Sequence, residues 1–109
     1  MATAYKILGQ SKPSAATNTT LYTVPTAKAA VVSTLAICND SASATAYRVF
    51  VSASASPTTS ESLVYGASVP ANDTVFLTFG ITAEASKRIV VYAAAANLVF
   101  HAFGSESDA

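Results

Sequence analysis

Residues 74–81 have the sequence Thr-Val-Phe-Leu-Thr-Phe-Gly-Ile, in which large apolar side chains recur at every second position. Successive side chains of a β-strand point to opposite faces, so Val75, Leu77 and Phe79 share one face and Phe76 lies on the other. An amphipathic helix would instead need apolar residues three and four positions apart. The segment therefore predicts a strand with one buried face and a second face that is also partly apolar.

Seven further segments show the same period of two and are rich in β-branched and aromatic residues. Short turn-forming stretches of Gly, Pro, Asn, Asp and Ser separate them, which leaves little room for helices between strands. The predicted strands cover residues 3–10, 19–24, 31–38, 45–52, 62–66, 74–81, 88–93 and 97–103. The series predicts an all-β chain with residues 1–109 in one domain, a single antiparallel β-sandwich, jelly-roll-like or Ig-like, of about eight short strands.

The alternation also separates inward from outward positions. The other predicted inward residues are Leu35, Ile37, Val49, Val51, Ile89, Val91, Leu98 and Phe100. The outward apolar residues are Phe76, Val90, Tyr92, Val99 and Phe103. Exposed apolar area of this kind often marks an interaction surface, although a loop or strand of the same chain could cover it. The candidate interface residues are accordingly Phe76, Tyr92, Val99, Phe103 and the strand charge Arg48, which could protect a sheet edge or pair across an interface.

Three of the connecting segments carry their own expectations. The low-complexity stretch 53–60 predicts a flexible surface loop, and the polar residues 104–109 predict a tail that is mobile or reaches a neighbouring molecule. The alanine run 93–96, closed by Asn97, predicts the tip of a hairpin joining the last two strands.

The charge pattern favours a protein that is packed against other protein subunits. Charged residues make up only 11% of the chain, and six basic residues balance six acidic ones. Near-neutral surfaces tend to associate, and nucleic-acid binding would need a basic cluster larger than Lys87-Arg88. We expect no nucleic acid and no membrane as partners, because the chain has no long apolar run and its start does not resemble a signal peptide.

The residues also offer little for catalysis. His101 is the single histidine, and no serine has the surroundings of a nucleophile elbow. The carboxylates fall in predicted turns or the tail, and no spacing of ligands suggests a metal or a bound cofactor. The single cysteine, Cys38, is interpreted as a small buried hydrophobe rather than a reactive thiol. We therefore expect no enzyme, no catalytic residues, no cofactor and no metal.

Several motifs resemble a known family. They are Tyr5-Lys-Ile-Leu-Gly-Gln10, Leu21-Tyr-Thr-Val-Pro25, Ala30-Val-Val-Ser-Thr-Leu35 with Ile37-Cys-Asn39, Tyr47-Arg-Val49, Pro70-Ala-Asn-Asp-Thr74 and Phe103-Gly104. Together they resemble small virion structural proteins of tailed bacteriophages, including phages of cyanobacteria. The resemblance implies a β-sandwich without active site or cofactor that forms a homo-oligomer, with a trimer favoured, or docks onto a larger shell or tail.

Within this family, the leading hypothesis is a capsid decoration or cement protein, made in the host cytoplasm and located in the virion, with the major capsid protein or other virion proteins as partners. A tail, neck or baseplate component is the alternative in the same class. In another class, the loops 53–60 and 68–73, at one end of the sandwich, would bind a host-surface receptor or glycan.

Overall fold

The computed structural model describes residues 3–108, without the side chains of Thr3 and Phe79. The described chain is almost entirely β-structure and contains one short 3-10 helix. Its elements are β1 (Thr3–Ser11), β2 (Thr19–Thr23), β3 (Lys28–Asn39), β4 (Thr45–Ser52), η1 (Thr59–Glu61), β5 (Ser62–Val69), β6 (Thr74–Ala83), β7 (Arg88–Ala93) and β8 (Leu98–Asp108). Every predicted strand is thus confirmed, although β1, β3, β5, β6 and β8 extend beyond their predicted bounds.

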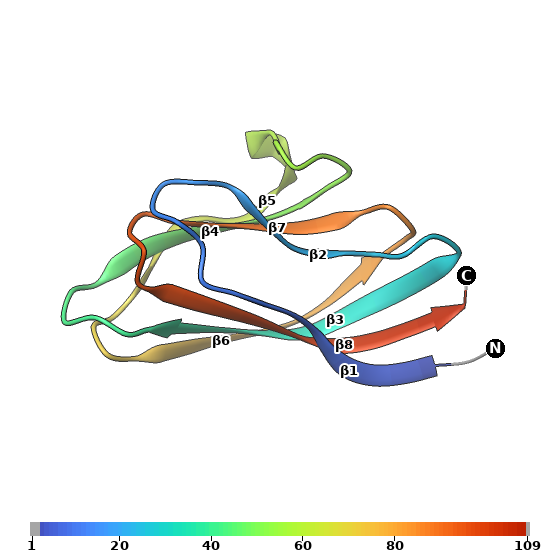
Figure 1. Cartoon of the computed structure of the whole chain (residues 1–109), viewed down its shortest axis with the longest axis horizontal. Helices are drawn as coiled ribbons and strands as arrows, with labels where there is room; N and C mark the ends of the chain where they lie inside the picture. The colour runs from blue at the N-terminus through green and yellow to red at the C-terminus, as the bar shows by residue number, and fades with distance from the viewer. Residues whose placement is uncertain (1–2, 109) are drawn as a thin grey trace.

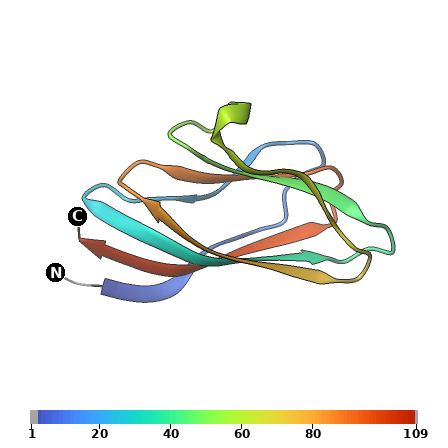
Figure 2. The same cartoon turned by 180° about the vertical axis from the view of Figure 1, so that it is seen from behind.

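The strands form two four-stranded antiparallel sheets that pack face to face (Figures 1 and 2). Sheet A has the order β1-β8-β3-β6, and sheet B has the order β2-β7-β4-β5. Strand 1 therefore pairs with 8, 2 with 7, 3 with 6 and 4 with 5. A long antiparallel strip that is folded over in this way is a jelly roll, so the connectivity distinguishes between the two sandwich types that the sequence left open.

The core lies between the sheets and follows the predicted period of two. All the predicted inward residues whose side chains are described pack in this core or against it, and Phe79 lies outside the described side chains. Leu35, Ile37 and Phe100 are among the largest side chains that are fully buried. Burial of apolar area on this scale is the main source of the fold's stability.

Two glycines allow the backbones to approach closely where the ladders are irregular. A Cβ atom on Gly9 would lie 2.2 Å from the carbonyl oxygen of Leu21, and one on Gly104 would lie 1.9 Å from that of Val31. The β1–β8 register shifts next to Gly9, and the β3–β8 register shifts next to the partner of Gly104. No other residue type fits either position without moving a neighbouring strand.

The polar segment at the end of the chain does not form the predicted mobile tail. Residues 104–108 continue β8, which lies between β1 and β3 and bonds to both. Lys28 pairs with Asp108 at the last rung, and Glu106 is buried. The tail prediction was wrong because the ladder bonds come from strands distant in sequence, whereas Ser, Glu and Asp are typical of exposed tails.

The alanine run is also not a hairpin tip, because β7 belongs to sheet B and β8 to sheet A. Residues 94–97 cross between the layers beside the turn after β3. Asn97 donates from its side-chain amide to the Ser41 hydroxyl at 2.7 Å, and the amide of Asp40 donates to the carbonyl of Asn97. The buried Asn39 accepts the Ser41 amide, which fixes this turn.

The segment 53–61 leaves β4, forms η1 and returns to β5 above the outer side of sheet B (Figures 1 and 2). Helix η1 contacts β4, and the Glu61 carboxylate accepts the Thr58 amide at 2.9 Å. Phe50 and Val90 point outward from sheet B but are only 3% and 0% exposed. A segment of the same chain therefore covers part of this outer face, which is the alternative that the sequence left open.

Candidate functional site

The outer face of sheet A is built from side chains that alternate with the core residues of its four strands. Cross-strand pairing places them in rows. One row contains Tyr5, Ser105, Val31 and Thr82, the next Ile7, Phe103, Thr34 and Thr78, the third Gln10, His101, Ala36 and Phe76, and the last Val99, Cys38 and Thr74. None of these outward positions carries a Lys, Arg, Asp or Glu, so across the described strands the face is uncharged.

The large apolar side chains on this face are open to solvent. Tyr5 is 86% exposed, Phe76 66%, Ile7 55% and Val31 40%. Phe103 and Val99 are half-buried between them. Scattered exposed apolar residues are normal, but a contiguous set on an uncharged sheet face is typical of a surface that contacts another molecule.

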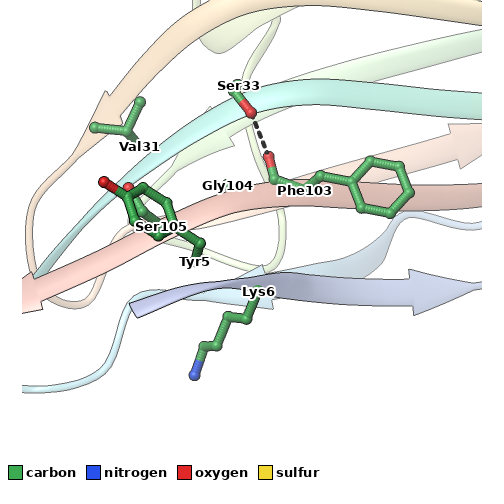
Figure 3. A pocket seen from close by; sticks show the side chains of 7 residues that line it. All are labelled: Tyr5, Lys6, Val31, Ser33, Phe103, Gly104 and Ser105. Atoms are coloured by element: carbon green, nitrogen blue, oxygen red, sulfur yellow. Dashed lines mark hydrogen bonds between the residues drawn. The ribbon is translucent and has the colours of Figure 1, made fainter. Parts of the chain in front are cut away.

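A shallow pocket of about 370 Å³ lies on this face at the end where β1 begins and β8 ends. Figure 3 shows its lining from β1, β3 and β8. The Tyr5 ring lies beside Ser105, and the Ser33 hydroxyl donates to the Phe103 carbonyl at 3.1 Å. The Lys6 side chain extends away from these residues, so the surface facing the pocket is apolar with a few hydroxyl groups.

Of the five interface residues expected from the sequence, three lie together on the outer face of sheet A, namely Phe76, Val99 and Phe103. The other two, Arg48 and Tyr92, lie on the outer face of sheet B. The sequence analysis named these residues without assigning them to a sheet, because alternation separates inside from outside but does not identify the sheet. It also missed Tyr5, Ile7 and Val31, whose spacing of two within predicted strands carries the same signal.

On sheet B, Arg48 lies between two tyrosine rings. Its guanidinium carbon is 4.1 Å from the ring centre of Tyr65 and 4.2 Å from that of Tyr92. Both tyrosines are its direct partners on the neighbouring strands. The Phe50 ring meets Tyr65 edge-on, so the stack continues to the part covered by segment 53–61.

A partly buried polar cluster links the two sheets near the start of β1 and the end of β8. Glu106 of β8 accepts a hydrogen bond from the Tyr22 hydroxyl of β2 and forms a salt bridge of 2.7 Å with Lys6 of β1. The hydrogen bonds from Lys6 and Tyr22 lower the pKa of Glu106 despite its burial. Burial, and then the adjacent carboxylate, raise the pKa of Tyr22. Sequence analysis placed Glu106 in a solvated tail and so missed this cluster.

His101 lies within the outer face of sheet A. Its ring contacts the Gln10 side chain at 3.1 Å and stacks on Phe103 at a centroid separation of 6.2 Å. None of the hydrogen bonds described for His101 joins it to a serine, a threonine or a carboxylate. The described residues contain no group of three His, Cys, Asp or Glu side chains that could hold a metal. Cys38 is half-buried on this same face and not in the core as expected.

The two loops expected to form a binding end are far apart. Segment 53–61 follows the end of β4, whereas residues 70–73 lie beyond the pair Thr45 and Val69 at the opposite end of the β4–β5 ladder. A receptor site that combines them, as the sequence analysis suggested, is therefore excluded. The geometry leaves the outer face of sheet A as the main candidate site, with the Arg48 stack as a separate feature.

No protein-family model matches the chain, and no curated protein or solved structure shows significant similarity to it. Across residues 3–108 the structure contains no helix with the length and hydropathy needed to cross a membrane.

Proposed function

We propose that this chain is a structural subunit of a bacteriophage particle, a capsid decoration or cement protein that acts through protein–protein contacts and not as an enzyme. The observation that carries the proposal is the outer face of sheet A, which is uncharged and exposes Tyr5, Ile7, Val31 and Phe76. Covering this face with protein removes apolar area from water without burying a charge.

The face is large enough for a stable contact. Four strands spaced by about 4.8 Å, over about nine residues of about 3.3 Å each, give roughly 570 Å². Covering it on both partners would bury about 1,100 Å², which is above the level of about 1,000 Å² expected of a biological interface. Neighbouring copies of this chain around a three-fold axis are suitable occupants, because this face brings no unpaired charge into the contact.

Two further observations support a virion. The jelly roll is an architecture of viral capsid domains, although the same architecture also occurs in lectins and cupins, so the fold does not by itself assign a function. The motifs that resemble phage structural proteins run through β1 to β4 and into β6 and β8, and thus through the strands that form the face. We propose a homotrimer that binds the major capsid protein, with no cofactor and no nucleic acid as partner.

Light scattering of the purified protein tests the oligomer. We expect a stable trimer at micromolar concentration, and the double variant Tyr5→Asp/Phe76→Asp to be monomeric with a melting temperature close to that of the isolated subunit. Leu63→Asp is the matched control, because Leu63 is 50% exposed on the other sheet. A wild-type monomer that does not assemble on shells either would contradict the proposal.

The location within the particle needs a separate measurement. Labelling the protein in intact virions and counting copies distinguishes a capsid protein, present in hundreds of copies, from the alternative of a tail, neck or baseplate component, present in a handful.

The pocket beside Tyr5 favours a second candidate, a host-surface glycan-binding module. An exposed tyrosine ring with Ser33 and Ser105 hydroxyls nearby suits the apolar face and the hydroxyl groups of a sugar. Binding to a glycan array that is lost in Tyr5→Ala would favour this function over assembly. Glycan binding that is absent while Tyr5→Ala still weakens the oligomer would exclude it.

A further inference from the structure

The lysines and the arginines of the described chain differ in their salt bridges. Every lysine forms a salt bridge: Lys6 with Glu106 at 2.7 Å, Lys12 with Asp40 at 2.6 Å, Lys28 with Asp108 at 2.7 Å and Lys87 with Glu84 at 3.9 Å. Neither Arg48 nor Arg88 forms a salt bridge within residues 3–108. This distribution is unexpected, because the planar guanidinium, with five N–H groups, is the cation best suited to a carboxylate.

Arg48 is held in a defined position without such a partner. The rings of Tyr65 and Tyr92 both lie against its guanidinium, whose carbon is 4.1 Å and 4.2 Å from their centres, and both tyrosines stand on the directly paired positions of β5 and β7. The coplanar N–H groups at the edge of the guanidinium are then the donors with which Arg48 can bind another group. The neighbouring row contains the small residues Ala46 and Ser68, which leave room for a group to approach that edge.

The chain's own remaining carboxylates are engaged elsewhere. Glu61 accepts the amide of Thr58 in the turn before η1 at 2.9 Å, and Asp73 accepts the amide of Thr74 at 2.8 Å. Each of these side chains therefore already satisfies a backbone donor in its own turn. An acidic group that pairs with Arg48 would come from outside the chain.

We propose that Arg48, clamped between Tyr65 and Tyr92, is a docking point for an aspartate or glutamate carboxylate of a partner protein. A carboxylate would accept two parallel hydrogen bonds from the edge of the guanidinium, whose orientation is fixed before binding. Arginine and tyrosine together are also typical of the residues that contribute most to protein interfaces. The site lies on sheet B, so it does not depend on what covers sheet A.

The test uses the full chain, labelled with ¹⁵N in its arginines, and follows the Nε–H resonances by NMR. The probe is an acetylated peptide of alternating glycine and glutamate, and the same peptide with glutamine is the neutral control. Inorganic phosphate and sialic acid are added in separate titrations. We expect a saturable shift of the Arg48 resonance with the glutamate peptide alone.

Two variants make the test specific. Arg48→Lys keeps the charge but removes the fork of N–H groups, and we expect it to weaken peptide binding by about tenfold. Lys87→Gln removes a charge from the same protein at a weak ion pair, and we expect binding to change by less than about twofold. The wild-type titration needs neither variant, so it remains informative if Arg48→Lys folds poorly.

Each of three results would overturn the inference: an Arg48 resonance that does not move, equal weakening by both variants, or a larger response to phosphate or sialic acid than to glutamate. Failure here with an intact oligomer would remove this docking point alone. Carboxylate binding by a protein that neither oligomerises nor assembles on shells would instead overturn the proposed assembly through sheet A.

Discussion

The two outer faces of the sandwich differ in how far their outward apolar side chains are exposed to solvent. Both carry large apolar side chains at outward positions, because neither sheet alternates cleanly between apolar and polar residues. On sheet B the outward Phe50 and Val90 are buried, η1 of segment 53–61 contacts the strand of Phe50, and Tyr65 and Tyr92 stack on Arg48. On sheet A nothing in the described chain covers Phe76. An apolar outward position therefore indicates an intermolecular contact only where no loop returns to it.

The largest effect is expected at Gly104, which allows β8 to approach β3 beneath the bare face. In Gly104→Ala the new Cβ would meet the Val31 carbonyl, so the strands must separate, and we expect the free energy of unfolding to fall by at least about 3 kcal/mol. Urea denaturation measures this loss. Gly80→Ala is the matched control on the same sheet, because a Cβ there meets nothing within 4 Å. Equal losses would show that the close approach is unimportant.

Substitutions of Phe50 and Phe76 test directly whether the outer face of sheet B is covered and that of sheet A is open. Phe50→Ala should lower the free energy of unfolding by about 2 to 3 kcal/mol, because it leaves a cavity under segment 53–61. Phe76→Ala should change the stability of the isolated subunit by less than about 0.5 kcal/mol while weakening assembly. Urea denaturation of dilute protein and light scattering separate the two effects. The opposite pattern would place the covered face on sheet A.

The polar cluster of Glu106, Lys6 and Tyr22 predicts that the free energy of unfolding depends on pH. Lys6 and Tyr22 hold the pKa of Glu106 below its ordinary value of 4.5, so its contribution to stability is complete above that pH and is lost as the pH falls through the lowered pKa. Glu106→Gln should be less stable than wild type by about 1 kcal/mol at pH 7. The two proteins should converge in acid.

Urea denaturation between pH 7 and pH 2 measures this convergence. Asp40→Asn, which removes an exposed salt bridge with Lys12, should cost less than about 0.5 kcal/mol and serves as the control. A difference between wild type and Glu106→Gln that stays constant with pH would mean that the carboxylate charge contributes nothing.

The smallest change in stability is expected for a substitution in a turn that belongs to neither outer face. Ala27 has φ 64° in the turn where the Lys28 amide donates to the Pro25 carbonyl. Glycine adopts this conformation without strain, so Ala27→Gly should raise the free energy of unfolding, by up to about 1 kcal/mol. Ala29→Gly, within β3, should lower it instead. Thermal unfolding of both variants provides a baseline for substitutions that leave the faces unchanged.

The sequence predicts every strand because the recurrence of apolar residues at every second position is a local pattern, which is clear in 31–38, 45–52 and 74–81. It does not predict where β8 ends, because the bonds that extend this strand to Asp108 come from β1 and from β3, both distant in sequence. For the same reason the alanine run resembles a hairpin tip, although it joins two different sheets.

The candidate site was predicted only in part. Alternation places Phe76 and Tyr92 outside the core, but sheet order alone separates them onto opposite faces. Val90 shows a second limit of the alternation, since it points outward from sheet B and is nevertheless fully buried. The Arg48 stack depends on three strands in register and has no signature along the chain.

The nested pairing of strands also determines how the chain must reach its native state. Among the strand pairs of residues 3–108, β4 and β5 alone are consecutive, whereas β1 and β8 join the two extremes of the described chain. Most strand pairs therefore form only after segments distant in sequence have come together. Folding on a timescale of roughly milliseconds to seconds is expected of such a topology. During this delay the uncharged outward positions on the strands of sheet A are unprotected. A high concentration of newly made subunits would thus favour aggregation, and prompt assembly with partners would limit it.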